Sequence, residues 1–119
     1  MSINYEIEYK NGITKINFLK RPDYKEAQKV IDEIAENFPY EKRLWDFTNI
    51  KFDFTMKEIE DIAEYGKMKF VKKNKMAMIA PGDLAYGELR ALGVYREQDG
   101  HAASRVFRTE QEALDWLNK

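Results

Sequence analysis

Two alternating runs joined by Asn11-Gly12 constrain the first part of the chain most strongly. Apolar side chains recur at every second position over residues 3–9, as in a strand with one buried face. Asn-Gly is the preferred pair for a type I′ turn, because both central residues need a positive φ. A two-residue turn fixes three cross-strand pairs: Tyr5 with Phe18, Ile7 with Ile16, and Glu8 with Lys15. We therefore expect one apolar face and an opposite, solvated face that carries an ion pair.

Capping signals and apolar runs divide the rest of the chain into alternating helices and strands. Three predicted helices begin with an acid or hydroxyl residue and a glutamate three positions later: Asp23 with Glu26, Thr55 with Glu58, and Thr109 with Glu112. Strands are predicted over residues 43–48, 75–80 and 104–108, and a further helix over 83–95. Single helices between strands imply parallel pairing. The prediction is one α/β domain over residues 1–119, in the order β-β-α-β-α-β-α-β-α, with a five-stranded mixed sheet, an N-terminal antiparallel hairpin and four helices.

Helical spacing predicts which side of each helix is buried. For the helix that begins after Thr55, the predicted apolar stripe is Met56, Ile59, Ile62, Ala63, Gly66 and Phe70. In the following helix, a glycine at position 87 costs about 1 kcal/mol relative to alanine. We expect close packing of that helix on the sheet to compensate for Gly87.

The scarcity of reactive residues excludes several classes of function. The chain has no cysteine and one histidine, His101, which excludes thiolate nucleophiles, iron–sulfur clusters, Cys-ligated zinc and multi-histidine metal centres. Ser2 and Ser104 are the only serines, so a Ser/His/Asp mechanism is not expected. Asp46 and Asp53 lie near the end of a strand, where we expect them to cap loops rather than to hold magnesium. The sequence predicts a non-enzyme with no catalytic residue, no metal and no cofactor.

The charge and hydropathy of the chain limit which partners and which cellular location we expect. The 20 Lys+Arg balance 21 Asp+Glu, and a net charge of −1 leaves no basic footprint for nucleic acid as a main role. The first twenty residues alternate polar and apolar, so they form neither a signal segment nor a membrane span. Without cysteine, nothing argues for an oxidising compartment. We expect a soluble, cytoplasmic protein.

The C-terminal part of the chain resembles a known family. The matching features are an apolar strand ending in Ala80-Pro81, the helix segment Ala85-Tyr86-Gly87 with Arg90, the strand Val106-Phe107-Arg108, and Glu112-Ala113-Leu114 with Trp116-Leu117. In these residues the chain is similar to small bacterial STAS-like proteins, which share the SpoIIAA-like fold of anti-sigma-factor antagonists. The element order agrees over nearly the whole chain. The resemblance implies a mixed sheet with four helices, and a regulatory or binding role rather than catalysis.

The family also implies a place for a phosphorylation switch. Its antagonists carry a phosphorylatable serine in an Asp-Ser-Ser-Gly run, at the start of the helix after the third strand. The matching segment here is Asp53-Phe54-Thr55-Met56, which keeps the acid and a hydroxyl but lacks the first serine and the glycine. A phosphate on Thr55 would meet free N–H groups and the positive end of the helix dipole. The alternative is a plain N-cap, which the Glu58 partner favours.

A cluster of lysines follows the acids of the same predicted helix. Its five members lie within nine residues with no acid among them: Lys67, Lys69, Lys72, Lys73 and Lys75. As a basic patch, they would attract an anionic lipid, a nucleotide or an acidic partner. Alternatively, acids at the start and bases at the end of one helix complement its dipole, which is the favoured interpretation.

The connection over residues 50–54 is more apolar than a short loop requires, since Ile50, Phe52 and Phe54 alternate with polar residues. These side chains either complete the core or line an apolar groove. We predict a ligand or partner groove formed by Trp45, Phe52, Phe54, Tyr86 and Arg90. Two functions are compatible with these features. The first is a non-catalytic, regulatory protein-interaction module of STAS type, acting on an unidentified protein or as a homodimer. The second is a carrier for a small lipid-like or nucleotide ligand, apolar or anionic.

Overall fold

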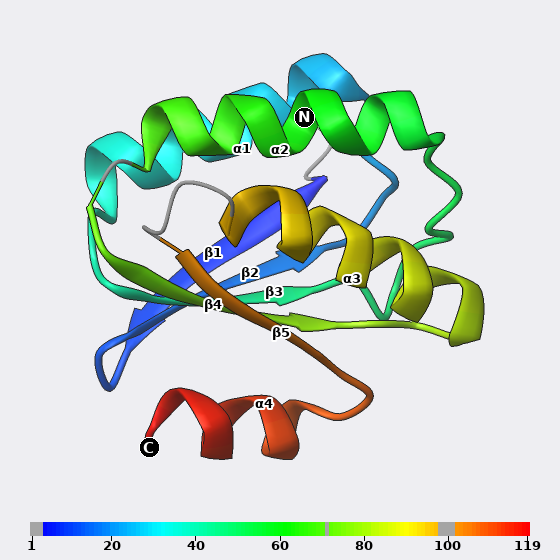
Figure 1. Cartoon of the computed structure of the whole chain (residues 1–119). Helices are drawn as coiled ribbons and strands as arrows, with labels where there is room; N and C mark the ends of the chain where they lie inside the picture. Colours follow the sequence, from blue (N-terminus) through cyan, green and yellow to red (C-terminus); the bar gives the residue numbers. More distant parts are fainter. Residues whose placement is uncertain (1–3, 71, 98–101) are drawn as a thin grey trace.

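The fold is a five-stranded sheet with three helices on one face and one helix on the other (Figure 1). A computed structural model describes residues 4–70, 72–97 and 102–119. The strands are β1 (Tyr5–Lys10), β2 (Ile13–Phe18), β3 (Lys42–Asp46), β4 (Asn74–Ile79) and β5 (Ala102–Phe107). The helices are α1 (Tyr24–Asn37), α2 (Met56–Lys69), α3 (Asp83–Glu97) and α4 (Glu110–Leu117). The predicted element order is confirmed, with boundaries that differ from the prediction by one or two residues.

The strands lie in the sheet in chain order, β1-β2-β3-β4-β5. β1 pairs with β2 antiparallel and the other pairs are parallel, so the predicted mixed sheet is confirmed. In the turn, Asn11 and Gly12 have φ values of 54° and 80°, as a type I′ turn requires. The three predicted cross-strand pairs all form: Tyr5 with Phe18, Ile7 with Ile16, and Glu8 with Lys15.

The predicted ion pair on the polar face of the hairpin has a different partner. Lys15 Nζ donates to Glu110 Oε1 on α4 at 2.6 Å. That hydrogen bond is the main reason why the pKa of Lys15 is raised, and Glu8 contributes only a weaker attraction. The prediction of a Glu8–Lys15 ion pair is therefore wrong, because Glu110 in the first turn of α4 offers Lys15 a nearer carboxylate.

Helices α1, α2 and α3 cover one face of the sheet, and α4 lies against the other (Figure 1). β4 is buried at nearly every position, and its last four residues are apolar, because both of its faces are covered. Met76 and Met78 pack under the three helices, whereas Ala77 and Ile79 pack against α4. The expected solvated face is confirmed at the β1 edge, where alternate residues are exposed. Within the described residues, no helix has the length and apolar character that crossing a bilayer requires.

The buried stripe of α2 agrees with the prediction except at its first residue. Ile59, Ala63 and Gly66 are buried, and so is the cap residue Phe70. Met56 is 50% exposed, so its assignment to the core is wrong. The preceding segment supplies two buried phenylalanines, Phe52 and Phe54, at this end of the helix.

The tightly packed glycine of α3 is Gly93 and not Gly87. Gly87 is exposed, and a Cβ built on it would meet no atom within 4 Å, so the expected close packing there is wrong. A Cβ on Gly93 would instead collide with Ser104 Oγ of β5 and lie 3.4 Å from Ser104 Cβ. Ser104 is also held in place, because its hydroxyl donates to Glu97 Oε1 at 3.0 Å. Gly93 therefore permits the close approach of α3 to β5.

Alanine substitution should separate these two glycines. We expect Gly87→Ala to raise the free energy of unfolding by about 0.5–1 kcal/mol, the usual gain at an exposed helical glycine. Gly93→Ala should lack this gain, because the new methyl group displaces the Ser104 hydroxyl from Glu97. Urea unfolding of both variants measures the difference, and adding Ser104→Ala to Gly93→Ala should recover part of it. Equal stabilisation by the two substitutions would contradict the close contact.

Candidate functional site

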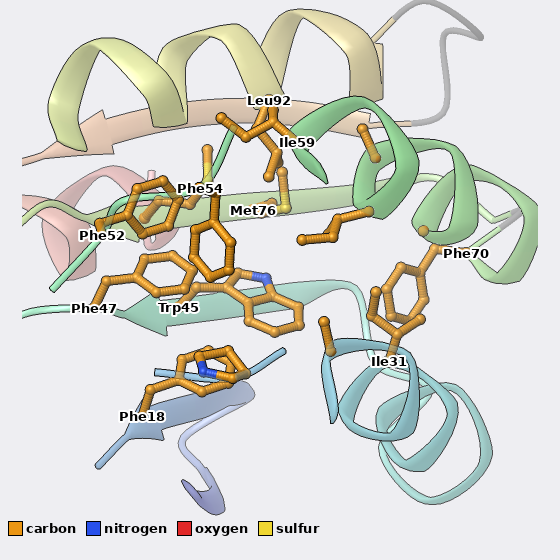
Figure 2. Close-up of a pocket in the computed structure, with 16 residues that line it drawn as sticks. Phe18, Ile31, Trp45, Phe47, Phe52, Phe54, Ile59, Phe70, Met76 and Leu92 are labelled. Carbon is orange, nitrogen blue, oxygen red and sulfur yellow. The ribbon is translucent and has the colours of Figure 1, made fainter. Parts of the chain in front are cut away.

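An apolar cavity of about 70 Å³ lies between the sheet and helices α1 and α2 (Figure 2). Every side chain that lines it is apolar apart from one indole nitrogen. The lining residues are Phe18, Pro22, Ala27, Ile31, Trp45, Phe47, Phe52, Phe54, Ile59, Ile62, Ala63, Gly66, Phe70, Met76, Met78 and Leu92. A single buried water needs about 10–15 Å³ and two to four polar partners. The cavity is thus large enough for several heavy atoms but offers little to hold water.

Trp45 of β3 lines this cavity near its centre (Figure 2). Its side chain is only 9% exposed, and no atom in the described part of the chain accepts a hydrogen bond from its Nε1. The indole ring has this one donor and no acceptor. Leaving such a donor buried and unpaired costs about 1–3 kcal/mol. Trp45 therefore brings one unsatisfied donor into otherwise apolar surroundings.

A chain of aromatic contacts holds one side of the cavity in place. Phe18 stacks on Phe47 with ring centroids 5.2 Å apart, and Phe47 meets Phe52 edge-on at 5.1 Å. Phe52 in turn meets Phe54 edge-on at 4.8 Å. Such pairs stabilise packing by about 0.5–1.5 kcal/mol each beyond the area they bury. The connection between β3 and α2 is thereby part of the core, as its apolar alternation indicated.

The structure brings together only part of the predicted groove. Trp45, Phe52 and Phe54 line the cavity. Tyr86 and Arg90 line a separate surface hollow between α3 and β5. The predicted five-residue groove is therefore divided between two places.

Several lining residues were missed as site residues, and the sequence held a partial signal for them. Phe47 directly follows β3, and Phe70 ends the apolar stripe of α2. Phe70 is predicted as part of the buried stripe of its helix, and Phe47 is not singled out by the sequence. Their convergence on Trp45 depends on how α1 and α2 cross the sheet, which one sequence does not specify.

Three of the five lysines of the predicted basic patch lie together. Lys69, Lys72 and Lys73 line an open hollow of about 290 Å³, together with Arg43 and Phe70. We call this the basic hollow. It lies where α2 ends and β3 begins. Phe70 also lines the apolar cavity, so its side chain stands between the two spaces.

The other two lysines act elsewhere. Lys67 Nζ pairs with Glu64 Oε1 one turn back on α2, at 3.1 Å. Lys75 lies toward α4, where its Nζ donates to the Trp116 carbonyl at 3.0 Å and lies 4.7 Å from the ring centroid of Trp116. A single patch of all five lysines is therefore not formed.

Arg43 places a buried cation beside Phe70. Its side chain is 4% exposed, and its guanidinium carbon lies 3.8 Å from the centroid of the Phe70 ring. Arginine stacks on aromatic faces in this way because its planar cation is weakly hydrated. The contact fixes Phe70 on the side of the basic hollow.

Thr55 forms the predicted capping box at the start of α2. Its Oγ1 accepts from the backbone N–H of Glu58 at 3.2 Å, and Glu58 Oε1 accepts from the Thr55 N–H at 2.9 Å. The N-cap role is therefore confirmed. Thr55 is an exposed residue, and the phosphorylation switch stays a prediction.

The remaining polar candidates have structural partners or lie outside the described residues. Asp46 Oδ1 accepts from the backbone N–H and the hydroxyl of Thr48, at 2.9 and 2.6 Å. Asp53 pairs with Arg21, which lowers the pKa of the Asp53 carboxyl. Both acids therefore tie loops, as expected. Among the described residues, no three His, Cys, Asp or Glu side chains gather as metal ligands would. His101 lies outside those residues.

A polar cluster joins α1 to α2 beside the basic hollow. Tyr65 Oη donates to Asp32 Oδ1 at 2.5 Å, and Lys69 Nζ lies 3.3 Å from the same oxygen. The hydrogen bond from Tyr65 is the main reason why the pKa of Asp32 is lowered, and Lys69 adds to the effect. The same bond raises the pKa of Tyr65. The cluster fixes the spacing of the two helices that cover the cavity.

Asp32→Asn tests the cluster through the pH dependence of stability. Because the pKa of Asp32 is lower in the folded protein, its contribution is complete above its ordinary value of 3.8 and is lost as the pH falls further. We expect the variant to be less stable at neutral pH, and the difference from wild type to shrink on acidification toward about pH 2. Urea unfolding across this range measures it, with Asp115→Asn on α4 as a control. A difference that stays constant with pH would contradict this role of the carboxylate.

Comparison with known proteins does not place the chain in a family: no protein-family model matches it, and no curated protein matches it.

Proposed function

We propose that this chain is a non-catalytic binding module that holds a small, mostly apolar ligand between its sheet and helices α1 and α2. The observation that carries the proposal is the unsatisfied Nε1 of Trp45 in the apolar cavity. A ligand with one hydrogen-bond acceptor would satisfy that donor. Its apolar part would contact the surrounding phenylalanine, isoleucine and methionine side chains.

The energetics favour a ligand of this composition. Filling 70 Å³ with apolar atoms is worth about 2 kcal/mol, at roughly 24 cal/mol per Å³. A hydrogen bond to the indole N–H adds about 1 kcal/mol. A strongly polar ligand would lose its hydration without finding partners in this lining. The carrier function therefore fits an apolar ligand, and it needs no reactive residue.

The two tryptophans allow a direct test with 2-hexanone, a short apolar chain with one carbonyl. We expect it to move the indole N–H signal of Trp45 to lower field in proton–nitrogen NMR spectra. The Trp116 signal should stay in place, because Trp116 packs with the α4 core on the opposite face. Trp45→Phe should weaken binding about fivefold through loss of one hydrogen bond. The methyl signals of Met76 and Met78, which line the cavity, report binding in that variant.

Trp116→Phe is the matched control and should bind 2-hexanone like wild type. It also leaves a single indole signal, which assigns Trp45. If millimolar 2-hexanone leaves the Trp45 signal unmoved, or moves both indole signals equally, the cavity is ordinary core and the proposal fails.

A second candidate is a regulatory protein-contact module of the STAS type, with a partner protein or a second copy of the chain. The observation that favours it lies at the edge of the sheet where α2 and α3 begin. Thr55 is exposed there, with Met56 beside it 50% exposed and Leu84 in the first turn of α3 72% exposed. Exposed apolar side chains around a modifiable hydroxyl suit a contact that phosphorylation would disrupt.

Thr55 variants separate the cap from the switch. Thr55→Ala should lower the free energy of unfolding by about 1 kcal/mol through loss of the cap. Thr55→Glu should in addition abolish capture of a partner that both wild type and Thr55→Ala retain. Pulldown from the native organism measures the capture, and analytical ultracentrifugation measures self-association. Identical partners and assembly for all three proteins would reject the switch.

A further inference from the structure

The basic hollow carries more positive charge than the helix end explains. Lys67 and Lys69 lie in the last turn of α2, where cations complement the helix dipole. Lys72 and Lys73 lie beyond the end of the helix, and the dipole effect falls off within the last turn. Both are exposed, and both line the basic hollow. Their charge is therefore available to a ligand.

The lysines give the basic hollow a net positive charge. Lys69, Lys72 and Lys73 line it, against one acid among its lining residues, Glu41. Asp32 offsets part of this charge by holding Lys69 at 3.3 Å. The remaining excess is positive. A concave surface with low-dielectric walls focuses such a field on an anion.

The basic hollow adjoins the apolar cavity through one side chain. Phe70 lines both spaces, and Figure 2 shows it at one side of the cavity, away from Phe47 and Phe52. Phe70 follows the last residue of α2, and Arg43 lies against its ring. Phe70 is therefore a side chain that the cavity and the basic hollow share as a common wall.

Strand β3 sets the spacing between the two polar features. Arg43 and Trp45 are two residues apart, so they share one face of the sheet about 7 Å apart. One residue contributes to the basic hollow and the other brings its indole N–H to the cavity. A carbon chain that reaches from the basic hollow to Trp45 therefore spans a comparable distance.

We propose that the ligand is a carboxylic acid whose apolar carbon chain carries a second oxygen. Its carboxylate would lie in the basic hollow and its carbon chain would run past Phe70 into the cavity. The second oxygen would accept a hydrogen bond from Trp45 Nε1. The proposal rests on the proposed ligand-binding function and adds the chemical class of the ligand.

The test uses three probes that differ by one group each, on the full chain at low salt. 7-Oxooctanoate has both the carboxylate and the ketone, octanoate lacks the ketone, and 2-octanone lacks the carboxylate. We expect 7-oxooctanoate to bind about tenfold more tightly than 2-octanone, as a hydrogen bond to a charged group allows. Both ketones should move the indole signal of Trp45 to lower field, whereas octanoate should bind without that displacement. Added salt should weaken the two acids and not 2-octanone.

Lysine variants locate the carboxylate. Lys72→Gln with Lys73→Gln should weaken 7-oxooctanoate about fivefold and leave 2-octanone unchanged. The matched control, Lys20→Gln with Lys51→Gln, removes the same charge from exposed positions at the opposite edge of the sheet and should have no effect.

The outcomes distinguish a failure of the acid assignment from a failure of the proposed ligand-binding function. If 2-octanone binds at Trp45 but 7-oxooctanoate binds no more tightly, or if the two lysine pairs act alike, the acid assignment is wrong and the ligand-binding function stands. If inorganic phosphate at matched ionic strength displaces 7-oxooctanoate as well as octanoate does, the basic hollow is a free-anion site and the assignment is also wrong. If 2-hexanone and 2-octanone both leave Trp45 unmoved, the function itself fails and the ligand class fails with it.

Discussion

The burial of β3 on both faces is the constraint on which the rest of the structure depends. This strand has five residues, and its three central ones are buried. Leu44 faces the core against α4, whereas Arg43 and Trp45 face the layer beneath the other helices. Alternation along a strand makes this division automatic. A shift of register by one residue would exchange the two sets and place a guanidinium in the α4 core. The neighbouring parallel pairs therefore hold the candidate site in place along with the fold.

The two faces of the sheet are covered by different kinds of side chain. On the α4 face, a helix of eight residues covers a small aliphatic core, in which Ala113 and Leu117 are fully buried. On the other face, helices α1 and α2 leave space that aromatic rings from the β3–α2 connection fill in part. Protein interiors are close-packed, and voids larger than a water molecule are few. The cavity beside Trp45 therefore sets this face apart from the small core on the α4 face.

The sequence predicted the elements well, because the signals for them are local. Asn11-Gly12 specified the hairpin and its register, and Thr55 with Glu58 specified the start of α2. Errors arose where the answer depended on packing between distant segments. Gly87 and Gly93 are indistinguishable without knowing which of them meets β5. Lys15 pairs with Glu110, ninety-five residues away in the sequence, and not with its cross-strand neighbour Glu8.

In the candidate site too, local signals in the sequence predict correctly, and errors arise from packing between distant segments. Trp45, Phe52 and Phe54 lie within one short stretch of sequence and line the cavity, whereas Tyr86 lies on a helix distant in sequence and lines a different hollow. The five lysines looked like one patch because they are close in sequence. The strand that begins at Asn74 sends Lys75 to the face of the sheet opposite the basic hollow.

The arrangement also explains how a chain with almost no net charge can present a local anion site. The acids of α2 lie toward its start, where Glu58 completes the cap, and the lysines lie at and beyond its end. Glu64 is paired with Lys67, and the first acid of the helix, Glu58, lies eleven residues before Lys69, or about 16 Å along the helix axis. That distance exceeds the screening length of about 8 Å at physiological salt, so the acids at the start of α2 do little to neutralise the basic hollow. The overall balance of charge keeps long-range attraction small. Selectivity for an anion therefore has to come from close contact, and from the apolar body that the adjoining cavity admits.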